Sequence, residues 1–165
     1  MPLRRLIFLA SLVRAVTAMN PSAALEGAHD TDRPLTGRAT GTTRLDLSTG
    51  TVTIDFTGHL SHLGAMTGHD ALTVKVTDST CSYTGTTTFV AANGDELFST
   101  VAGSGTFTTA TTAQSTHTGT ITGGTGRFAG ASGTYTDTAS FVLVSASGPI
   151  QISHLTAAFE GEISY

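Results

Sequence analysis

Apolar and polar residues alternate along much of the chain after residue 50. The alternation is clearest in two segments, where every second residue is apolar: Val52, Ile54 and Phe56 in the first, and Leu72, Val74 and Val76 in the second. The residues between them are mostly threonine. Because successive side chains of a β-strand point to opposite faces of the sheet, this pattern predicts strands with one buried face and one solvated face.

Turn signals divide the rest of the chain into further short strands. Asn93-Gly94 is the strongest hairpin signal, and it separates predicted strands at 86–92 and 97–101. The other predicted strands follow the same pattern and lie at 51–57, 72–77, 107–108, 118–122, 135–144 and 150–163. No segment shows the helical periodicity that parallel βαβ units need, so the sequence predicts an all-β, antiparallel fold of about eight strands.

The composition favours a closed sheet. Charged residues make up only 12% of the chain and glycine contributes 19 residues, which disfavours helices and favours strands and turns. Threonine is β-branched and suits the solvated face of a strand. Closing the sheet on itself would remove its exposed edges. We therefore expect one domain over residues 35–165, a single eight-stranded antiparallel β-barrel.

The first 18 residues have the pattern of a signal peptide. Arg4 and Arg5 precede the apolar run 6–13, and Val16-Thr17-Ala18 resembles a cleavage site. The apolar run is too short to cross a bilayer, so we expect a secreted, extracellular protein without stable membrane insertion. Residues 19–34 lack apolar periodicity and are predicted to form a flexible N-terminus of the mature protein.

Charge and cysteine content exclude two further readings. Cleavage after residue 18 would remove three of the eight basic residues and none of the twelve acidic ones, leaving a net charge of about −7. No basic surface remains for a nucleic-acid partner. Cys81 is the only cysteine, so an intramolecular disulfide cannot form, and a buried thiol is the expected state.

One glycine-dense segment carries a resemblance. The segment 123–133 reads Gly-Gly-Thr-Gly-Arg-Phe-Ala-Gly-Ala-Ser-Gly, follows Thr-Gly-Thr-Ile-Thr at 118–122 and is matched later by Phe159-Glu160-Gly161. With these flanks it resembles the allene oxide cyclase-like barrel superfamily, which includes the plant dirigent proteins. It also resembles exported actinobacterial barrel proteins of unknown function, in which a segment like His62-Leu63-Gly64 precedes the middle strands.

The resemblance covers roughly residues 36–165 and implies an eight-stranded barrel with a central cavity. Members of that superfamily steer the cyclisation or coupling of small hydrophobic molecules without an organic cofactor. Their catalytic acids do not match positions of this chain, so the resemblance transfers no catalytic residue.

Several residues are candidates for a site within such a cavity. His62, Glu160 and Glu162 are the candidate proton-transferring groups, because imidazole and paired carboxyl groups perform acid and base chemistry. The candidate ligand-binding residues are His62, Arg127, Tyr135 and Phe56, and Asp137 is a further candidate for the cavity wall. A structural role in turns or on the solvated face is the alternative for each of them.

The histidines do not predict a metal site. His59, His62 and His69 lie close together in the sequence, near Asp55 and Asp70. On a continuous strand His59 and His62 would face opposite sides, so they could share a metal ion only across a bulge or turn. We expect neither a metal nor an organic cofactor.

Three functions remain open from the sequence. The first is an exported, non-catalytic barrel that binds a small hydrophobic ligand or a surface partner. The second is a cofactor-free cyclase or isomerase that acts on a small hydrophobic substrate in the cavity. The third is a structural secreted or envelope module, in which side chains fill the lumen and the barrel assembles as a homo-oligomer.

Overall fold

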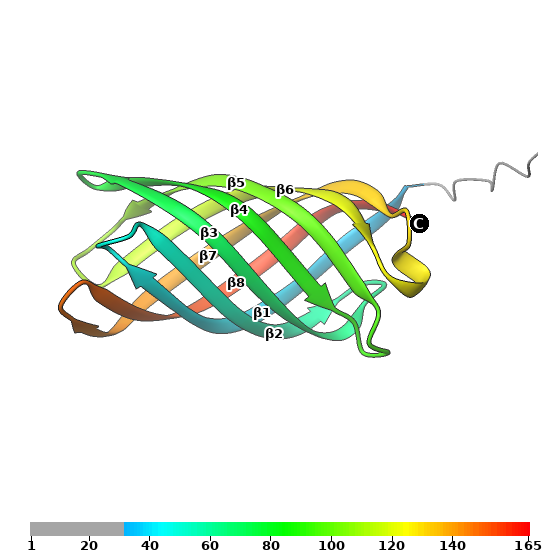
Figure 1. The fold of residues 1–165 in the computed structure, drawn as a ribbon, viewed down its shortest axis with the longest axis horizontal. Helices are drawn as coiled ribbons and strands as arrows, with labels where there is room; N and C mark the ends of the chain where they lie inside the picture. Colours follow the sequence, from blue (N-terminus) through cyan, green and yellow to red (C-terminus); the bar gives the residue numbers. More distant parts are fainter. Residues whose placement is uncertain (1–31) are drawn as a thin grey trace, which may run out of the picture.

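The computed structural model describes residues 32–165, which form one closed barrel of eight antiparallel strands (Figure 1). Each strand pairs with the next along the chain, and β8 pairs with β1 to close the sheet. The strands are β1 (Arg33–Asp46), β2 (Thr51–Leu60), β3 (Gly64–Thr77), β4 (Thr80–Val90), β5 (Glu96–Phe107), β6 (Thr112–Gly124), β7 (Ser132–Ser147) and β8 (Ile150–Ser164). The predicted eight-stranded antiparallel barrel is confirmed.

Two of the predicted strand assignments were wrong. Phe107 does not start a strand of its own but ends β5, which runs without interruption from Glu96. The sequence pattern also missed β1, which begins at Arg33, two residues before the expected start of the barrel. The predicted signal peptide 1–18 and all of 19–34 except its last three residues lie outside the described residues.

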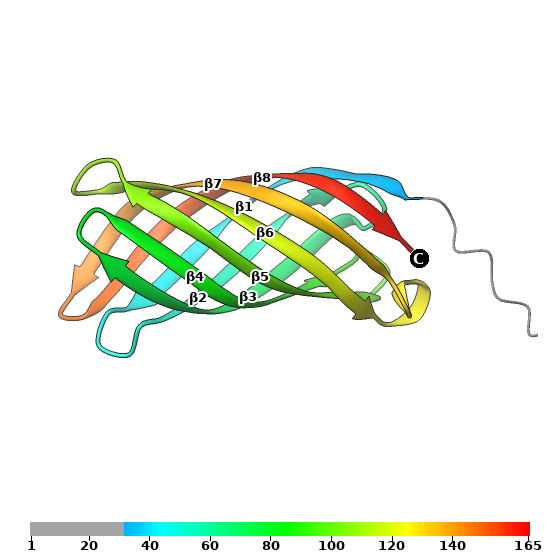
Figure 2. The same cartoon turned by 90° about the horizontal axis from the view of Figure 1, so that it is seen from above.

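The two ends of the barrel differ in their connections. At one end, here called the distal end, lie the four tight turns 47–50, 78–79, 108–111 and 148–149. At the other, the terminal end, lie the remaining three connections together with both ends of the described chain (Figures 1 and 2). The connection between β6 and β7 contains the short 3-10 helix η1 (Gly126–Phe128).

Large apolar side chains close the terminal end. They are almost completely inaccessible to solvent and come from five strands, a turn and η1: Leu35, Leu60, Leu63, Phe89, Leu97, Phe128 and Ile163. The ring of Phe128 also packs edge-on against Tyr165, with 5.1 Å between ring centroids. The glycine-rich segment after β6 therefore serves to fold Phe128 over this end of the lumen.

Inward-facing glycines make room for rings at mid-barrel. Gly68 on β3 is the register partner of Phe56 on β2, and a Cβ atom at Gly68 would overlap the Phe56 ring. Gly119 on β6 stands in the same relation to Tyr135 on β7. Each ring thus lies against bare backbone of the neighbouring strand, an arrangement in which glycine permits close approach.

No helix within residues 32–165 is long and apolar enough to span a membrane.

The substitution Gly68→Ala is expected to destabilise the barrel by about 1–3 kcal/mol, the usual cost of overpacking a core. The added methyl group would push on Phe56, whose ring is already packed against Phe89 and Phe159. Urea unfolding followed by circular dichroism measures the effect. Thr67→Ala on the outer face of the same strand is the control and should change the free energy of unfolding by less than about 0.5 kcal/mol. Equal stability of the two variants would contradict this account.

Candidate functional site

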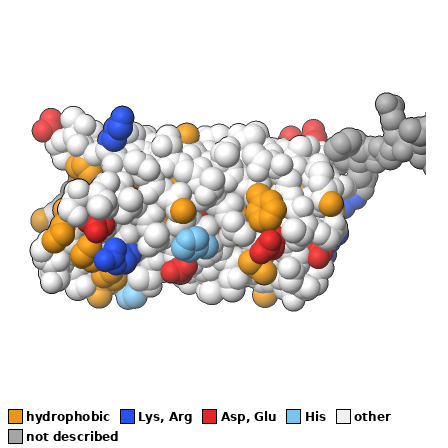
Figure 3. All heavy atoms as spheres, in the orientation of Figure 1, with side chains coloured by type: hydrophobic (Ala, Val, Ile, Leu, Met, Phe, Trp, Pro, Cys, Tyr) orange, Lys and Arg blue, Asp and Glu red, His pale blue; other side chains and the backbone are white. Residues whose placement is uncertain are grey.

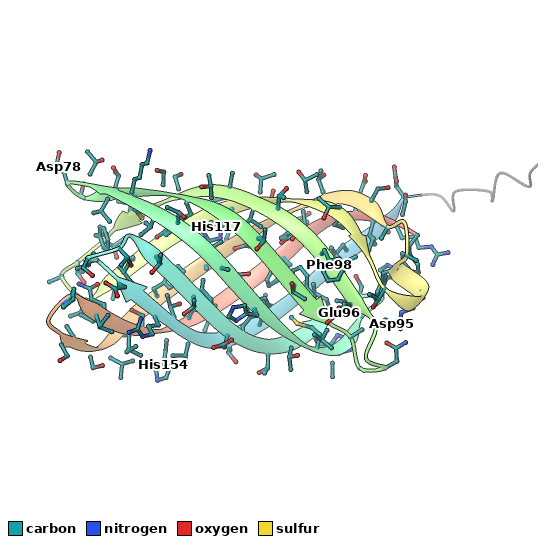
Figure 4. All side chains as sticks on the ribbon, viewed as in Figure 1. Asp78, Asp95, Glu96, Phe98, His117 and His154 are labelled. Atoms are coloured by element: carbon teal, nitrogen blue, oxygen red, sulfur yellow. The ribbon has the colours of Figure 1, made fainter. Side chains whose placement is uncertain are left out.

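A layer of polar side chains crosses the lumen near the middle of the barrel. Asp70 enters it from β3, His117 from β6 and Asp137 from β7. His117 and Asp137 are register partners on adjacent strands, which places their side chains next to each other on the inner face. Figure 4 shows His117 inside the barrel wall at mid-length, whereas His154 points outward. We call Asp70, His117 and Asp137 the lumen triad.

His117 and Asp137 form a buried hydrogen-bonded pair. The Nδ1–H of His117 donates to Oδ1 of Asp137 over 2.9 Å, and the two side chains are only 7% and 11% exposed. This bond fixes the ring orientation and, in the neutral ring, leaves the lone pair on Nε2. Nε2 is buried and has no hydrogen-bond partner among residues 32–165. It is therefore an acceptor, or a base, available to a group in the lumen.

Asp70 is the second group with an unsatisfied atom. Its Oδ1 is buried and has no hydrogen-bond partner. Burial raises the pKa of this carboxyl to about 6, with a further upward contribution from the charge of Asp137, while the Thr87 hydroxyl and His117 act in the opposite direction. At neutral pH the chain thus holds a poorly solvated carboxylate in its lumen, and strongly shifted groups of this kind gather at functional sites.

Aromatic rings surround the triad. Phe56, Phe89, Tyr135 and Phe159 form one cluster of mutually packed rings, with centroid separations between 5.7 and 6.3 Å. The Tyr135 hydroxyl is hydrogen-bonded to Ser99 over 2.8 Å, and burial raises its pKa above the ordinary value. The rings exclude water from the site and strengthen its electrostatic interactions.

The opposite side of the triad faces Tyr83 and Cys81. The Tyr83 ring packs edge-on against His117, with 5.1 Å between centroids. The thiol of Cys81 donates to the Tyr83 hydroxyl over 2.8 Å, and burial raises the pKa of Tyr83 above its ordinary value. The expected buried thiol at Cys81 is confirmed.

Two cavities meet at the triad. The inner cavity, about 20 Å³, is lined by all three triad residues together with Thr87, Tyr135 and other inward side chains. The mouth cavity, about 60 Å³, lies between His117 and the distal end. Ile54, His117 and Phe141 line both cavities, so they form the boundary between the two.

The mouth cavity reaches solvent at the distal end. Val76 and Phe107 line it, and these side chains are 44% and 36% exposed. The exposed large apolar residues at and near this end are Leu47, Val76, Phe107, Val142 and Val144. Figure 3 shows hydrophobic side chains gathered over the distal end. The lumen thus has an apolar entrance at one end and a closed wall at the other.

The structure brings His62 and Arg127 together, but at the terminal end. Nη2 of Arg127 donates to the backbone carbonyl of His62 over 2.6 Å, and Nε2 of His62 lies 3.1 Å from the carbonyl oxygen of Pro34. His62 has φ 70°, a left-handed conformation that these contacts hold in place. Neither residue lines the inner or the mouth cavity. Their interactions are those of a turn support.

The remaining candidates divide between the two faces of the wall. Phe56, Tyr135 and Asp137 line the inner cavity. Glu160 and Glu162 are exposed on the outer face of β8, so they cannot exchange protons with a molecule in the lumen.

The outer face carries a separate histidine–aspartate pair. Nδ1 of His69 lies 2.7 Å from Oδ1 of Asp55, and both side chains are more than half exposed. They line a broad, threonine-rich hollow of about 840 Å³ on the outside of the barrel. Among residues 32–165, no three His, Cys, Asp or Glu side chains are arranged to hold a metal ion.

Inspection of the sequence had missed His117 and placed Asp70 only among possible metal ligands. The available signal was positional parity, because residues of a strand that are an even number apart share a face. Asp70 has the same parity as Leu72 and Val74, and His117 has the same parity as Ile121. A polar residue that continues the apolar face of a predicted strand beyond its N-terminal end was the sign of this site.

Comparison of the chain with protein-family models, with curated proteins and with solved structures found no match in any of the three. The resemblance to allene oxide cyclase-like barrels therefore stays a prediction, whereas the closed eight-stranded barrel is observed directly.

Asp70→Asn is expected to stabilise the protein at neutral pH but not in acid. The folded-state pKa of Asp70, about 6, lies above its ordinary value of 3.8, so the folded state binds the proton more tightly and stability falls as the pH rises between these values. The shift corresponds to at most about 3 kcal/mol. The gain of the variant over the wild type should grow from near zero at pH 4 to its maximum above pH 7.

Urea unfolding at a series of pH values measures this difference. Asp55→Asn on the outer face is the matched control and should show no gain of this size at any pH. A gain for Asp70→Asn that is independent of pH would contradict the assignment of a destabilised carboxylate to the lumen.

Proposed function

We propose that the barrel binds a small, mostly apolar molecule in its lumen, entering through the distal end, and that the lumen triad holds the one polar group of that molecule. The observation that carries this proposal is the pair of buried acceptors, Asp70 Oδ1 and His117 Nε2, which line one cavity and have no hydrogen-bond partner in the part of the chain that the structure describes.

The energetics favour a ligand over a purely structural role. A buried polar atom without a partner costs about 1–3 kcal/mol, and more when it is charged. A module that needed only a packed lumen would be more stable with apolar side chains at Asp70 and His117. A ligand that donates hydrogen bonds to both atoms would remove the cost on binding.

The cavities limit the size of the ligand. A cavity that binds benzene measures about 150 Å³, whereas the inner and mouth cavities measure about 20 and 60 Å³. The two cavities together are about half as large as that benzene cavity, which corresponds to a molecule of about three non-hydrogen atoms. Larger ligands require the exposed side chains of Val76 and Phe107 to move aside.

Export forms part of the proposal and rests on the signal-peptide pattern of residues 1–18. A ligand-binding role also agrees with what the resemblance to cavity-containing barrels implies.

A four-carbon alcohol tests the binding proposal. 1-Butanol should bind saturably and shift amide NMR signals of inward residues on β3, β6 and β7. Ala139→Leu fills the inner cavity, which Ala139 lines, and should weaken binding at least tenfold. The matched control is Ala102→Leu, on the outer face of β5, which should bind as the wild type does. Signal changes confined to the outer face, or no saturable change, would overturn the proposal.

A second candidate function is supported by the His117–Asp137 pair. A histidine oriented by a buried carboxylate, with a free Nε2, is the arrangement of a general base. With Asp70 protonated, the site could move a proton between carbon and oxygen of a carbonyl compound. His117 Nε2 would take a proton from the carbon next to the carbonyl group while Asp70 gives its proton to the oxygen, which yields the neutral enol. The reverse transfers restore the carbonyl compound.

Deuterium exchange into 2-butanone in D2O tests this isomerase chemistry. The protein should accelerate exchange about a hundredfold over buffer, the lower range of acid–base catalysis. His117→Gln should abolish the acceleration, whereas His154→Gln on the outer face should retain it. The rate should decline above about pH 6 as Asp70 loses its proton. Exchange no faster than in buffer would exclude the isomerase and leave the binding proposal standing.

A further inference from the structure

We infer that the lumen selects an organic cation, an apolar molecule carrying a primary ammonium group, and that Asp70 and His117 accept its hydrogen bonds. This inference rests on the proposed binding function and names the chemical class of the ligand.

The charged groups of the lumen have one sign. Two carboxyl groups, Asp70 and Asp137, line the inner cavity, and no lysine or arginine lines either cavity. Asp137 is already hydrogen-bonded to His117, but Oδ1 of Asp70 has no hydrogen-bond partner among the described residues. A buried carboxylate without a cation is one of the most costly arrangements in a protein interior, and a cationic ligand is its natural complement.

The count of hydrogen-bond donors points to the same class. The inner cavity offers two acceptors without a hydrogen-bond partner among residues 32–165, Asp70 Oδ1 and His117 Nε2. A primary ammonium has three N–H donors and can satisfy both, whereas a hydroxyl has one and a carboxylate has none. A carboxylate would also be repelled by Asp70 and Asp137. The expected order of affinity is therefore amine, then alcohol, then acid.

The walls of the inner cavity suit a cation as well. Phe56, Tyr135 and Phe159 all line it. The face of an aromatic ring attracts a positive charge, and the attraction is stronger in a site without water. These rings also cover the methylene groups next to the ammonium, so one wall serves both parts of the ligand.

The titratable groups of the lumen give the inference a pH dependence. Asp70 on β3, His117 on β6 and Asp137 on β7 face the inner cavity, together with the phenol of Tyr135. Cys81 and Tyr83 on β4 face the mouth cavity, and neither cavity is lined by a titratable group from β1, β2, β5 or β8. Protonation of Asp70 removes the charge that would pair with the ligand. Affinity for an amine should therefore fall below about pH 6, whereas affinity for an alcohol should not.

Three molecules of equal chain length test the inference. Isothermal titration at pH 7.5 compares n-butylamine, which is protonated there, with 1-butanol and butyrate. We expect n-butylamine to bind at least tenfold more tightly than 1-butanol, and butyrate not to bind. Repeating the titration at pH 5 should reduce or remove the preference for the amine.

Two variants locate the effect. Asp70→Asn keeps the shape of the side chain and removes its charge, so it should lose the preference for n-butylamine over 1-butanol. Asp55→Asn removes a carboxyl from the outer face and should keep the preference, which separates lumen binding from attraction to surface charge. Thermal unfolding confirms that both variants are folded.

The outcomes distinguish this inference from the proposed function. If 1-butanol binds as well as or better than n-butylamine, the ammonium assignment is wrong and the lumen remains a binding site. If none of the three molecules binds, both proposals fail. If the preference for the amine survives in Asp70→Asn, the cation is held elsewhere and the role of Asp70 is overturned.

Discussion

The lumen of an eight-stranded barrel is only wide enough for side chains to fill, and this limit decides what can stand at each inward position. Phe56, Tyr135 and His117 point inward at mid-barrel, and each has a glycine as its register partner on the adjacent strand. A Cβ atom at any of the three glycines would meet the ring beside it. The aromatic core and the polar layer are therefore built by the same pairing of ring and glycine.

The difference between the two ends gives the lumen a direction. Phe128 and Leu63 close the terminal end completely, whereas Val76 and Phe107 leave apolar surface open at the distal end. His117 lies between these ends and borders both cavities. A molecule entering at the distal end would pass apolar walls before it reached a polar group, which is why the proposed ligand is an apolar molecule with one polar terminus.

Period-two patterning predicted the barrel because most strands bury one face and solvate the other. It failed at β1, where Gly37 and Gly41 occupy inward positions that an apolar pattern would fill, and at β5, where Gly103 interrupts the apolar face. The site was harder to predict because His117 stands among threonines, and only its parity with Ile121 places it inside. That it meets a carboxylate depends on the register of β6 against β7, which no local pattern specifies.

The lumen triad lowers the folding stability of a barrel that has few other sources of stability. The chain has a single cysteine and no disulfide among its described residues, so its barrel depends on the sheet and the packed core for stability. Within that core, Asp137 and His117 are hydrogen-bonded to each other, but Asp70 Oδ1 and His117 Nε2 have no hydrogen-bond partner among the described residues. Apolar residues at these positions would give a more stable barrel. The cost of these two unpaired acceptors is the reason for proposing that a donor from outside the chain binds at the end of the apolar entrance.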